Sequence, residues 1–383
     1  MVMWVQRIFM LLLVSSFASS DFIENPDFET PPLNSNASSN SSMLLDQNNT
    51  LPGWTVQGTV QYVTSLELPD TGHAIQLSED GKINQTFSAK GDDMNYILTF
   101  ALIPGGKNCS ASAGVIVSGP DSNSVFSYRH NYSQAPWQSY SHNLGSWGNG
   151  EPINLVLESQ TVDSDTNSTC WPIIDTLLIK TLGVTLVQDS GNLLSNGGFE
   201  SGPSFLPNST EGVLIDAVPS LIQSALRQWS VTGTVRYIDS EHFHVAEGKA
   251  AIEILADTSP SSIQTATRDT SEGSRYNLTF SLGDANDACR GHFVVGVQAG
   301  SAAQNFTLES NGTGSGEKFG LVFRAEEAAT QISFTSYSVT ITKEDVLCGP
   351  VIDQVMVLPL GGTASVKPTW LLLLFALLYV AFL

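Results

Sequence analysis

The sequence predicts an all-β protein built from two tandem β-sandwich domains of the jelly-roll type. Apolar and polar residues alternate in short runs, as in 276–280 and 332–334, and this is the period of a half-buried strand. Gly, Asn, Asp and Ser separate these runs, as in antiparallel sandwiches. Only 14% of the residues are charged, which does not favour amphipathic helices. In addition, long blocks of the chain occur twice.

The duplicated blocks follow one another in the same order in both halves. The block Cys170–Asp175 recurs as Cys348–Asp353, and each copy indicates a bulge or edge position that leads into a buried strand. Three further pairs of blocks match: Asn25–Glu29 with Asn196–Glu200, Trp54–Val63 with Trp229–Ile238, and Tyr96–Phe100 with Tyr276–Phe280. A tandem duplication explains this order. We therefore predict a first domain at 21–187 and a second domain at 188–360.

The N-terminal segment 1–20 is typical of a secretory signal peptide. Arg7 precedes the apolar run Ile8–Val14, and the small residues Ala18 and Ser20 stand at the positions that a signal peptidase reads before Asp21. We therefore expect an extracellular protein.

The C-terminal segment 361–383 is typical of a signal for a glycosylphosphatidylinositol (GPI) anchor. Small residues at 361–365 and a polar spacer precede the apolar run Trp370–Leu383. That run is shorter than the ~20 residues that span a bilayer. We predict attachment at Gly361 or Gly362, with the tail removed and the protein on the outer face of the plasma membrane. A tail anchor, or an apolar C-terminus left in place, is the alternative.

Eleven Asn-x-Ser/Thr sequons are spread over both halves, as suits an exported glycoprotein. Asn277 lies in the strand-like run Tyr276–Leu282 and is therefore not among the expected acceptors. The long Asn/Ser-rich loop Leu33–Thr50 is expected to be glycosylated. The expected acceptors are Asn36, Asn40, Asn48, Asn84, Asn108, Asn131, Asn167, Asn208, Asn305 and Asn311.

Four cysteines allow three disulfide pairings. A bridge formed in the ancestral domain would be inherited twice, so the duplication selects Cys109 with Cys170 and Cys289 with Cys348. Free thiols or a bridge between the halves are the alternatives.

One helix is predicted, at Val213–Gln228, because its apolar residues fall at helical spacing. Pro219 would bend or split this helix.

Sugar recognition needs an aromatic face against the sugar ring and a few groups that bind its hydroxyls. Trp54 and Trp229 open alternating strands in both copies, so packing in the core is the expectation for these two and for most other aromatics. The loop cluster His242–His244, between Asp239 and Glu247, is the preferred site. Solvated loop residues are the alternative role of the two histidines. The two histidines have no third metal ligand at short spacing. The candidates are Tyr237, Asp239, His242, Phe243, His244 and Arg290 in the second half, and Tyr62, Trp137, Trp147 and Trp171 in the first.

The sequence contains no recognisable catalytic motif. The patterns of zinc metalloproteases, serine-hydrolase elbows, phosphate-binding loops and redox-active dithiols are absent. Carboxylates are plentiful, and a glycosidase pair is invisible in sequence. We expect a binding protein rather than an enzyme, with an undetected hydrolase as the remaining alternative.

Several of these blocks resemble the plant cell-wall proteins known as the domain of unknown function 642 family. The resemblance rests on Asn196–Glu200, Tyr237–Ser240 with the following His242 and Phe243, and Cys348–Asp353, and it extends from Asp21 to Leu358. It implies two tandem galactose-binding-like β-sandwiches in the cell wall. It also implies binding to wall polysaccharide (cellulose, hemicellulose or pectin) and to pectin methylesterase, with a change in the activity of that enzyme.

The first half departs from the family pattern. Pro26 and Asp27 replace the two glycines of the second copy, and Trp171 replaces Gly349. Functions of the family therefore transfer less directly to this half.

A broader resemblance, to carbohydrate-binding jelly rolls, implies a structural calcium ion in each domain, although no cofactor is required. Ca²⁺ takes six to eight oxygen ligands, and carboxylates on the first and last strands would contribute: Glu29 with Asp175, and Glu200 with Asp353. A helix or strand cap and a surface carboxylate are the alternative roles.

The formal net charge is −21, from 16 Lys and Arg against 37 Asp and Glu. Such a surface repels nucleic acid and anionic lipid, whereas a basic esterase is an electrostatically suitable partner. The sequence thus indicates a wall-polysaccharide binding protein. A protein–protein adaptor without direct sugar binding is the alternative.

Overall fold

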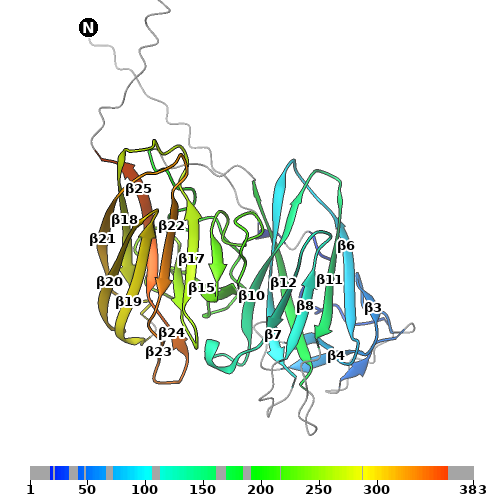
Figure 1. The fold of residues 1–383 in the computed structure, drawn as a ribbon. Coiled ribbons are helices and arrows are strands. Elements are labelled where there is room, and N and C mark those ends of the chain that lie inside the picture. The colour runs from blue at the N-terminus through cyan, green and yellow to red at the C-terminus, as the bar shows by residue number, and fades with distance from the viewer. Residues whose placement is uncertain are drawn as a thin grey trace, which may run out of the picture.

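The computed structural model describes residues 22–33, 42–46, 49–65, 72–105, 113–160, 170–183, 191–215, 217–286 and 288–360, together with the backbone of 18–19. Within these ranges the chain forms strands and one short 3₁₀ turn, η1 (His130–Tyr132), and no α-helix. Two β-sandwiches lie side by side (Figure 1). The all-β fold predicted from the sequence is therefore confirmed. In the described part of the chain, no helix has the length and apolar character needed to cross a bilayer.

The first sandwich packs two antiparallel sheets against each other. Its inner sheet contains, in spatial order, β2 (Met43–Leu44), β4 (Val60–Ser65), β5 (Gly72–Leu77), β12 (Pro172–Gly183), β7 (Met94–Pro104) and β10 (Gln138–Trp147). Its outer sheet contains β3 (Thr55–Gln57), β6 (Lys82–Ser88), β11 (Pro152–Gln160), β8 (Gly114–Ser118) and β9 (Asn123–Ser127).

Two further pairings complete this sandwich. The strand β2 lies inside the predicted Leu33–Thr50 loop and pairs with β4. The two-residue strand β1 (Ala18–Ser19) pairs with β12, and it belongs to the segment 1–20 whose removal the sequence predicts.

The second sandwich repeats this arrangement. Its inner sheet contains β15 (Thr234–Asp239), β16 (Ala250–Leu255), β25 (Val351–Pro359), β18 (Arg275–Gly283) and β21 (Gly316–Arg324). Its outer sheet contains β14 (Ser230–Thr232), β17 (Ser261–Ala266), β22 (Gln331–Ser336), β19 (Arg290–Ala299) and β20 (Ala302–Asn311). A small ribbon of β23 (Thr340–Ile341) and β24 (Leu347–Cys348) closes one end.

The strand orders of the two halves match one to one. The order β4-β5-β12-β7-β10 corresponds to β15-β16-β25-β18-β21, and β3-β6-β11-β8-β9 corresponds to β14-β17-β22-β19-β20. The strands β12 and β25 are the last of their halves along the chain, and each carries a bulge just after an aspartate, Asp175 or Asp353. The residue that follows this aspartate has a positive φ angle in both strands. The duplication seen in the sequence is therefore a duplication of topology.

The predicted helix at Val213–Gln228 is wrong. Its first residues form strand β13 (Val213–Ile215), and an irregular loop follows. In this loop Val218 pairs with Val231, while Ala225 and Leu226 enter the core. Of the apolar residues at helical spacing, Leu214, Ala225 and Leu226 are buried, whereas Ile222 is 74% exposed. Pro219 also lacks the amide hydrogen that a continuous helix needs.

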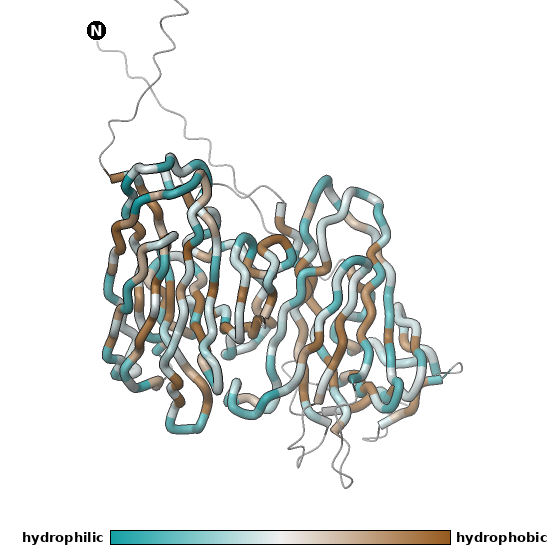
Figure 2. Tube along the Cα trace, in the orientation of Figure 1, coloured by the Kyte–Doolittle hydropathy of each residue, from teal (hydrophilic) through white to brown (hydrophobic). Residues whose placement is uncertain are grey.

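Strand β13 joins the two sandwiches. It pairs in parallel with β10 of the first half and antiparallel with β15 of the second half. The two inner sheets therefore form one 13-stranded sheet, although each half keeps its own core. Ile97 of the first half lies in the second core, and Leu214, Leu255 and Leu347 of the second half lie in the first. Apolar segments follow the strands of both halves in Figure 2.

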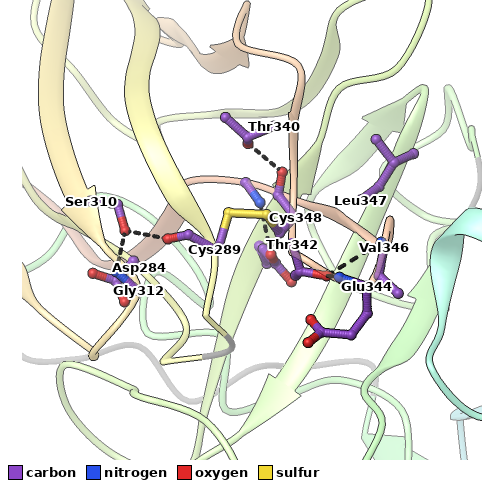
Figure 3. The surroundings of a disulfide bond; sticks show 12 residues. Asp284, Cys289, Ser310, Gly312, Thr340, Thr342, Glu344, Val346, Leu347 and Cys348 are labelled. Atoms are coloured by element: carbon purple, nitrogen blue, oxygen red, sulfur yellow. Dashed lines mark hydrogen bonds between the residues drawn. A yellow bond between two sulfur atoms is a disulfide. The ribbon is translucent and has the colours of Figure 1, made fainter.

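A disulfide connects Cys289 and Cys348 in the second sandwich, with Cα atoms 5.8 Å apart, as the duplication predicts. Ser310 Oγ and Thr340 Oγ1 donate hydrogen bonds to the carbonyl oxygens of the two cysteines (Figure 3). In the first half Cys170 is disulfide-bonded. Cys109, its predicted partner, lies outside the described residues.

Other predictions also fall outside the described residues. They are the rest of the predicted signal peptide, the predicted anchor signal 361–383 with Gly361 and Gly362, and the sequons at Asn36, Asn40, Asn48, Asn108 and Asn167. Of the remaining expected acceptors, Asn208, Asn305 and Asn311 are exposed, and Asn84 and Asn131 are half-buried.

Candidate functional site

The repeated aromatic residues hold a turn in each half. Trp229 is fully buried, and its Nε1 donates a hydrogen bond to the carbonyl oxygen of Asn196 at 3.0 Å. Tyr237 donates from its hydroxyl to the carbonyl oxygen of Phe199 at 2.9 Å. Trp54 and Tyr62 make the same bonds to Asn25 and Phe28 in the first half. These aromatics therefore position the Asn196–Glu200 turn and its copy at the start of each domain.

A cleft of about 720 Å³ opens beside this turn in the second half. Its wall consists of the loop that follows the turn, the ends of β15 and β16, and Lys180 from β12 of the first half. The residues that matter for its chemistry are Lys180, Glu200, Phe205, Tyr237, Asp239, His242 and Lys249. We call this the Phe205 cleft.

Phe205 supplies the aromatic surface of the cleft. Its half-buried ring stacks on Tyr237, with ring centroids 5.0 Å apart and planes 3° from parallel. Burial raises the pKa of the Tyr237 hydroxyl, and the charge of Glu200 raises it further, so this hydroxyl stays protonated. The stack is therefore a neutral platform with charged groups around it.

Glu200 and Lys180 place opposite charges at the cleft. Glu200 Oε1 accepts hydrogen bonds from the backbone amides of Lys249 and Ala250, at 2.8 and 3.4 Å. Lys180 donates from Nζ to the carbonyl oxygen of Gly202 at 2.8 Å. Burial lowers the pKa of Lys180, and the Glu200 charge opposes this change. Both halves of the molecule thus build the cleft.

Asp239 and His242 form a compact polar unit at its rim. Asp239 Oδ1 accepts hydrogen bonds from the amides of Glu241 and His242, at 2.8 and 2.9 Å. The same oxygen lies 3.0 Å from His242 Nδ1. Asp239 is buried, whereas the His242 side chain is 36% exposed. The aspartate therefore orients an accessible imidazole.

The structure brings together three of the predicted sugar-binding residues, Tyr237, Asp239 and His242. Phe243 packs against a small apolar cluster with Ile238, and the amide of His244 bonds to the Ala285 carbonyl. These two and the exposed Arg290 on β19 do not line the cleft.

The candidates of the first half also lie elsewhere. Trp137 is buried next to the cleft, in an apolar cluster that includes Leu206. Trp147 is half-buried and donates to the Leu144 carbonyl, while the carbonyl of the half-exposed Trp171 accepts from Gly105. These three tryptophans are not part of the Phe205 cleft.

Sequence reasoning missed Phe205 and Lys180. An aromatic residue between Pro203 and Pro207, directly after the duplicated turn, was the available signal for Phe205. No local signal marks Lys180, because it reaches the cleft from the other half.

The predicted calcium ligands hold backbone amides. Glu29 Oε1 accepts from the His73 amide at 2.7 Å, and Glu200 takes the equivalent position. Asp175 Oδ1 and Asp353 Oδ1 each accept from the next amide in their bulges. No group of three or more His, Cys, Asp or Glu side chains in the described ranges is placed to hold a metal. A structural calcium therefore stays a prediction, and carbonyl oxygens would have to supply most of its ligands.

A second groove, of about 610 Å³, lies between the tip of the β8–β9 hairpin, β10 and the loop after β13. Buried His142 contributes to it, with Nε2 3.1 Å from Ser122 Oγ. Burial lowers the pKa of this histidine to about 4, so it is neutral at higher pH. Hydroxyl and amide groups otherwise dominate this groove, and it has no aromatic platform comparable to the Phe205–Tyr237 stack.

The fold and the cleft define a tandem jelly-roll protein with a polar cleft at the junction of its halves. The chain belongs to the family described as "Protein of unknown function (DUF642)", whose model matches residues 21–180 and 192–358. Family membership fits an extracellular cell-wall protein.

Two relatives come from Arabidopsis thaliana. The chain is 32% identical to Protein DUF642 L-galactono-1,4-lactone-responsive gene 2, over 92% of this chain and 96% of that protein. It is 30% identical to Protein TEEBE, over 88% of this chain and 90% of that protein. Neither relative is named as an enzyme.

Solved structures overlap only loosely with this chain. One is TmCBM61 in complex with β-1,4-galactotriose, at 16% identity and a TM-score of 0.28, covering 44% of this chain and 99% of that one. Another is a Paenibacillus xanthan lyase, at 13% identity and a TM-score of 0.24, covering 79% of this chain and 25% of that one. These overlaps carry no functional argument.

Proposed function

We propose that this protein binds cell-wall polysaccharide without chemically altering it, and that the Phe205 cleft is the binding site. The observation that carries the proposal is the Phe205–Tyr237 stack inside a polar cleft. An aromatic surface suits the apolar face of a sugar ring, and surrounding donors and acceptors suit its hydroxyls.

The polar groups of the cleft are already oriented. Backbone amides hold the Glu200 and Asp239 carboxylates, and Asp239 holds His242. Such groups lose little freedom when a ligand binds, which favours affinity. Lys180 and Lys249 share the cleft with the carboxylates of Glu200, Asp239 and Glu241, so the charges of the cleft do not favour an acidic sugar over a neutral one. The proposed ligand is therefore cellulose, hemicellulose or pectin.

Binding of the full-length secreted chain to pectin, hemicellulose and cellulose oligosaccharides tests this proposal. We expect Phe205→Ala to weaken binding by at least tenfold and Phe205→Tyr to retain it. His73→Ala is the matched control, because His73 stacks on Tyr62 at the equivalent place in the first half, with centroids 4.9 Å apart. Equal binding by Phe205→Ala and the unmodified chain would contradict the assignment, provided that both melt at similar temperatures. Release of new reducing ends would contradict a purely binding role.

A basic wall protein, with pectin methylesterase as the specific candidate, is the second proposed partner. The observation that favours it is the net charge of −21, which attracts a basic enzyme and speeds association. We expect complex formation to weaken steeply as salt is raised. Salt-independent association, or esterase activity unaffected by the bound protein, would argue against this partner.

We also propose that a lipid anchor holds the protein at the outer face of the plasma membrane. The support is the order of small residues, spacer and apolar run in 361–383. Phosphatidylinositol-specific phospholipase C should release the protein from cells. Retention after complete digestion would instead indicate that the apolar segment remains.

A further inference from the structure

The two sandwiches use the same sheet face in different ways. In the first half, the outward face of β7, β10 and β12 is covered by the second sandwich. Ile97 is fully buried in the core of the second half. Lys180 on β12 and Asn143 on β10 donate hydrogen bonds to the carbonyl oxygens of Gly202 and Ile222. This face is therefore the interface between the halves.

In the second half, no domain formed by the described residues packs on the matching face of β18, β21 and β25. Its side chains include three large apolar residues, Val322, Met356 and Leu358, which are 45%, 37% and 36% exposed. These three side chains lie on two strands on either side of β18, and exposed apolar side chains that gather on one sheet face favour a cover or a binding function. The second copy therefore retains the sheet face that forms the interface in the first copy, but none of the described domains packs against it.

Asn277 stands in the middle of this apolar patch. The register of the strands places it directly between Val322 on β21 and Leu358 on β25. Thr279, two residues further along β18, lies between Gly320 and Met356. Asn277 is the counterpart of Ile97, because Tyr96–Phe100 and Tyr276–Phe280 are the matching blocks. A polar residue therefore replaces the buried isoleucine of the covered copy.

Asn277, Leu278 and Thr279 form a sequon whose two polar residues point to the open face. Successive side chains of a strand alternate between faces. Leu278 is fully buried in the core, while Asn277 and Thr279 are half-exposed. A Cβ atom at Gly320 would lie 3.3 Å from Asn277 Oδ1, so the glycine leaves space beside the acceptor. The strand therefore does not hide this sequon, because Asn277 and Thr279 lie on its outward face.

We propose that Asn277 carries an N-linked glycan that covers the apolar patch of Val322, Met356 and Leu358. The reaction uses a lipid diphosphate-linked oligosaccharide of the secretory pathway. The side-chain amide nitrogen of Asn277 forms the bond to the anomeric carbon and gives up one proton, and the lipid diphosphate leaves. The apolar ring faces of the first sugars then lie against the patch, where the second sandwich lies in the other copy. This modification is independent of the Phe205 cleft.

Glycopeptide mapping of the full chain, secreted from a eukaryotic cell, tests this proposal. Digestion with a peptide N-glycosidase in heavy-oxygen water should convert Asn277 to labelled aspartate. Thr279→Val should lose the mass of one glycan, whereas Thr279→Ser keeps the sequon and should retain it. We expect Thr279→Val, and not Thr279→Ser, to bind a hydrophobic dye several-fold more strongly and to self-associate.

Exposed Asn311 is the internal reference for the mapping, because its sequon lies at the end of β20. An unmodified Asn277 in a preparation whose Asn311 is glycosylated would overturn the proposal. A glycan at Asn277 whose loss changes neither dye binding nor self-association would overturn the covering role. If Asn277 is unmodified, a dimer formed through this face would identify a second copy of the chain as the cover of the apolar patch.

Discussion

Arg236 and Glu253 form a buried ion pair at the junction of the two sandwiches, with Arg236 Nη1 2.6 Å from Glu253 Oε2. The two side chains are 4% and 0% exposed. Arg236 Nη2 also donates to the carbonyl oxygens of Tyr132 and Leu347, and Glu253 Oε1 accepts from the Gly349 amide. The pair thus links the first half, the inner sheet of the second half and the segment that carries Cys348.

The first half provides a neutral version of this pair. Gln61 and Gln76 face each other on β4 and β5 as Arg236 and Glu253 do on β15 and β16. We expect Glu253→Gln to destabilise the protein by about 3–5 kcal/mol, because it leaves the arginine charge buried without its partner. Adding Arg236→Gln should restore part of the loss. Chemical denaturation measures both, and strictly additive effects would show that the two charges are not coupled.

Two buried groups should make stability depend on pH in opposite directions. Burial, assisted by the charges of Glu200 and Glu247, raises the pKa of Asp353 from 3.8 to about 6, although backbone hydrogen bonds oppose this change. The folded protein holds this proton more tightly than the unfolded chain, so stability falls as pH rises from about 4 to 6. Burial lowers the pKa of His142 from 6.5 to about 4, so its contribution rises over a similar range.

Single variants should separate these contributions. Compared with the unmodified chain, the melting temperature of His142→Gln should decrease more as pH rises from 4 to 6, because only the Asp353 contribution remains. The melting temperature of Asp353→Asn should increase more over the same range, because only the His142 contribution remains. Thermal melts at closely spaced pH values measure this. The same pH profile in both variants would mean that neither group titrates as its burial indicates.

Removal of the Cys289–Cys348 disulfide should weaken the second sandwich. The bridge closes a sequence separation of 59 residues, for which loop entropy predicts a loss of about 4 kcal/mol. We expect Cys289→Ala/Cys348→Ala to unfold at lower urea, with the second half losing structure first. Hydrogen exchange resolved by peptide would locate the change, and uniform loss of protection across both halves would contradict this order.

Chelation tests the predicted calcium ions. If oxygen ligands around Glu29 or Glu200 hold calcium, a chelator should lower the melting temperature and added Ca²⁺, but not Mg²⁺, should restore it. An identical melt in chelator would end the calcium hypothesis for both halves.

Local patterns in the sequence were sufficient for many of the strands. Tyr276, Leu278 and Phe280 on β18, and Ile332 and Phe334 on β22, alternate with their neighbours and place one face of each strand in the core. The same reasoning failed at Val213–Gln228. Val218 and Leu226 have helical spacing there, but Val218 is half-buried and bridges Val231, whereas Leu226 lies in the second core. Apolar spacing therefore did not predict the backbone conformation of this segment, because contacts with segments that are distant in the sequence determine it.

The cleft was predicted only in part for a related reason. Tyr237, Asp239 and His242 lie within a few residues of one another, so a sequence can point to them together. Phe205 and Lys180 join them only because the turn after Glu200 packs against β12 of the other half. Contacts between distant segments leave no mark in a local pattern.

The sequence by itself determined that one β-rich unit is present twice, which residues of several strands face the core, and which cysteines pair in the second copy. Only the tertiary structure decided that the two copies differ in their surroundings. The face of β7 that carries Ile97 is buried by the following domain, whereas within the described part of the chain no domain covers the matching face around Asn277. Burial depends on which surfaces meet in space, and two nearly equivalent strands therefore have different roles.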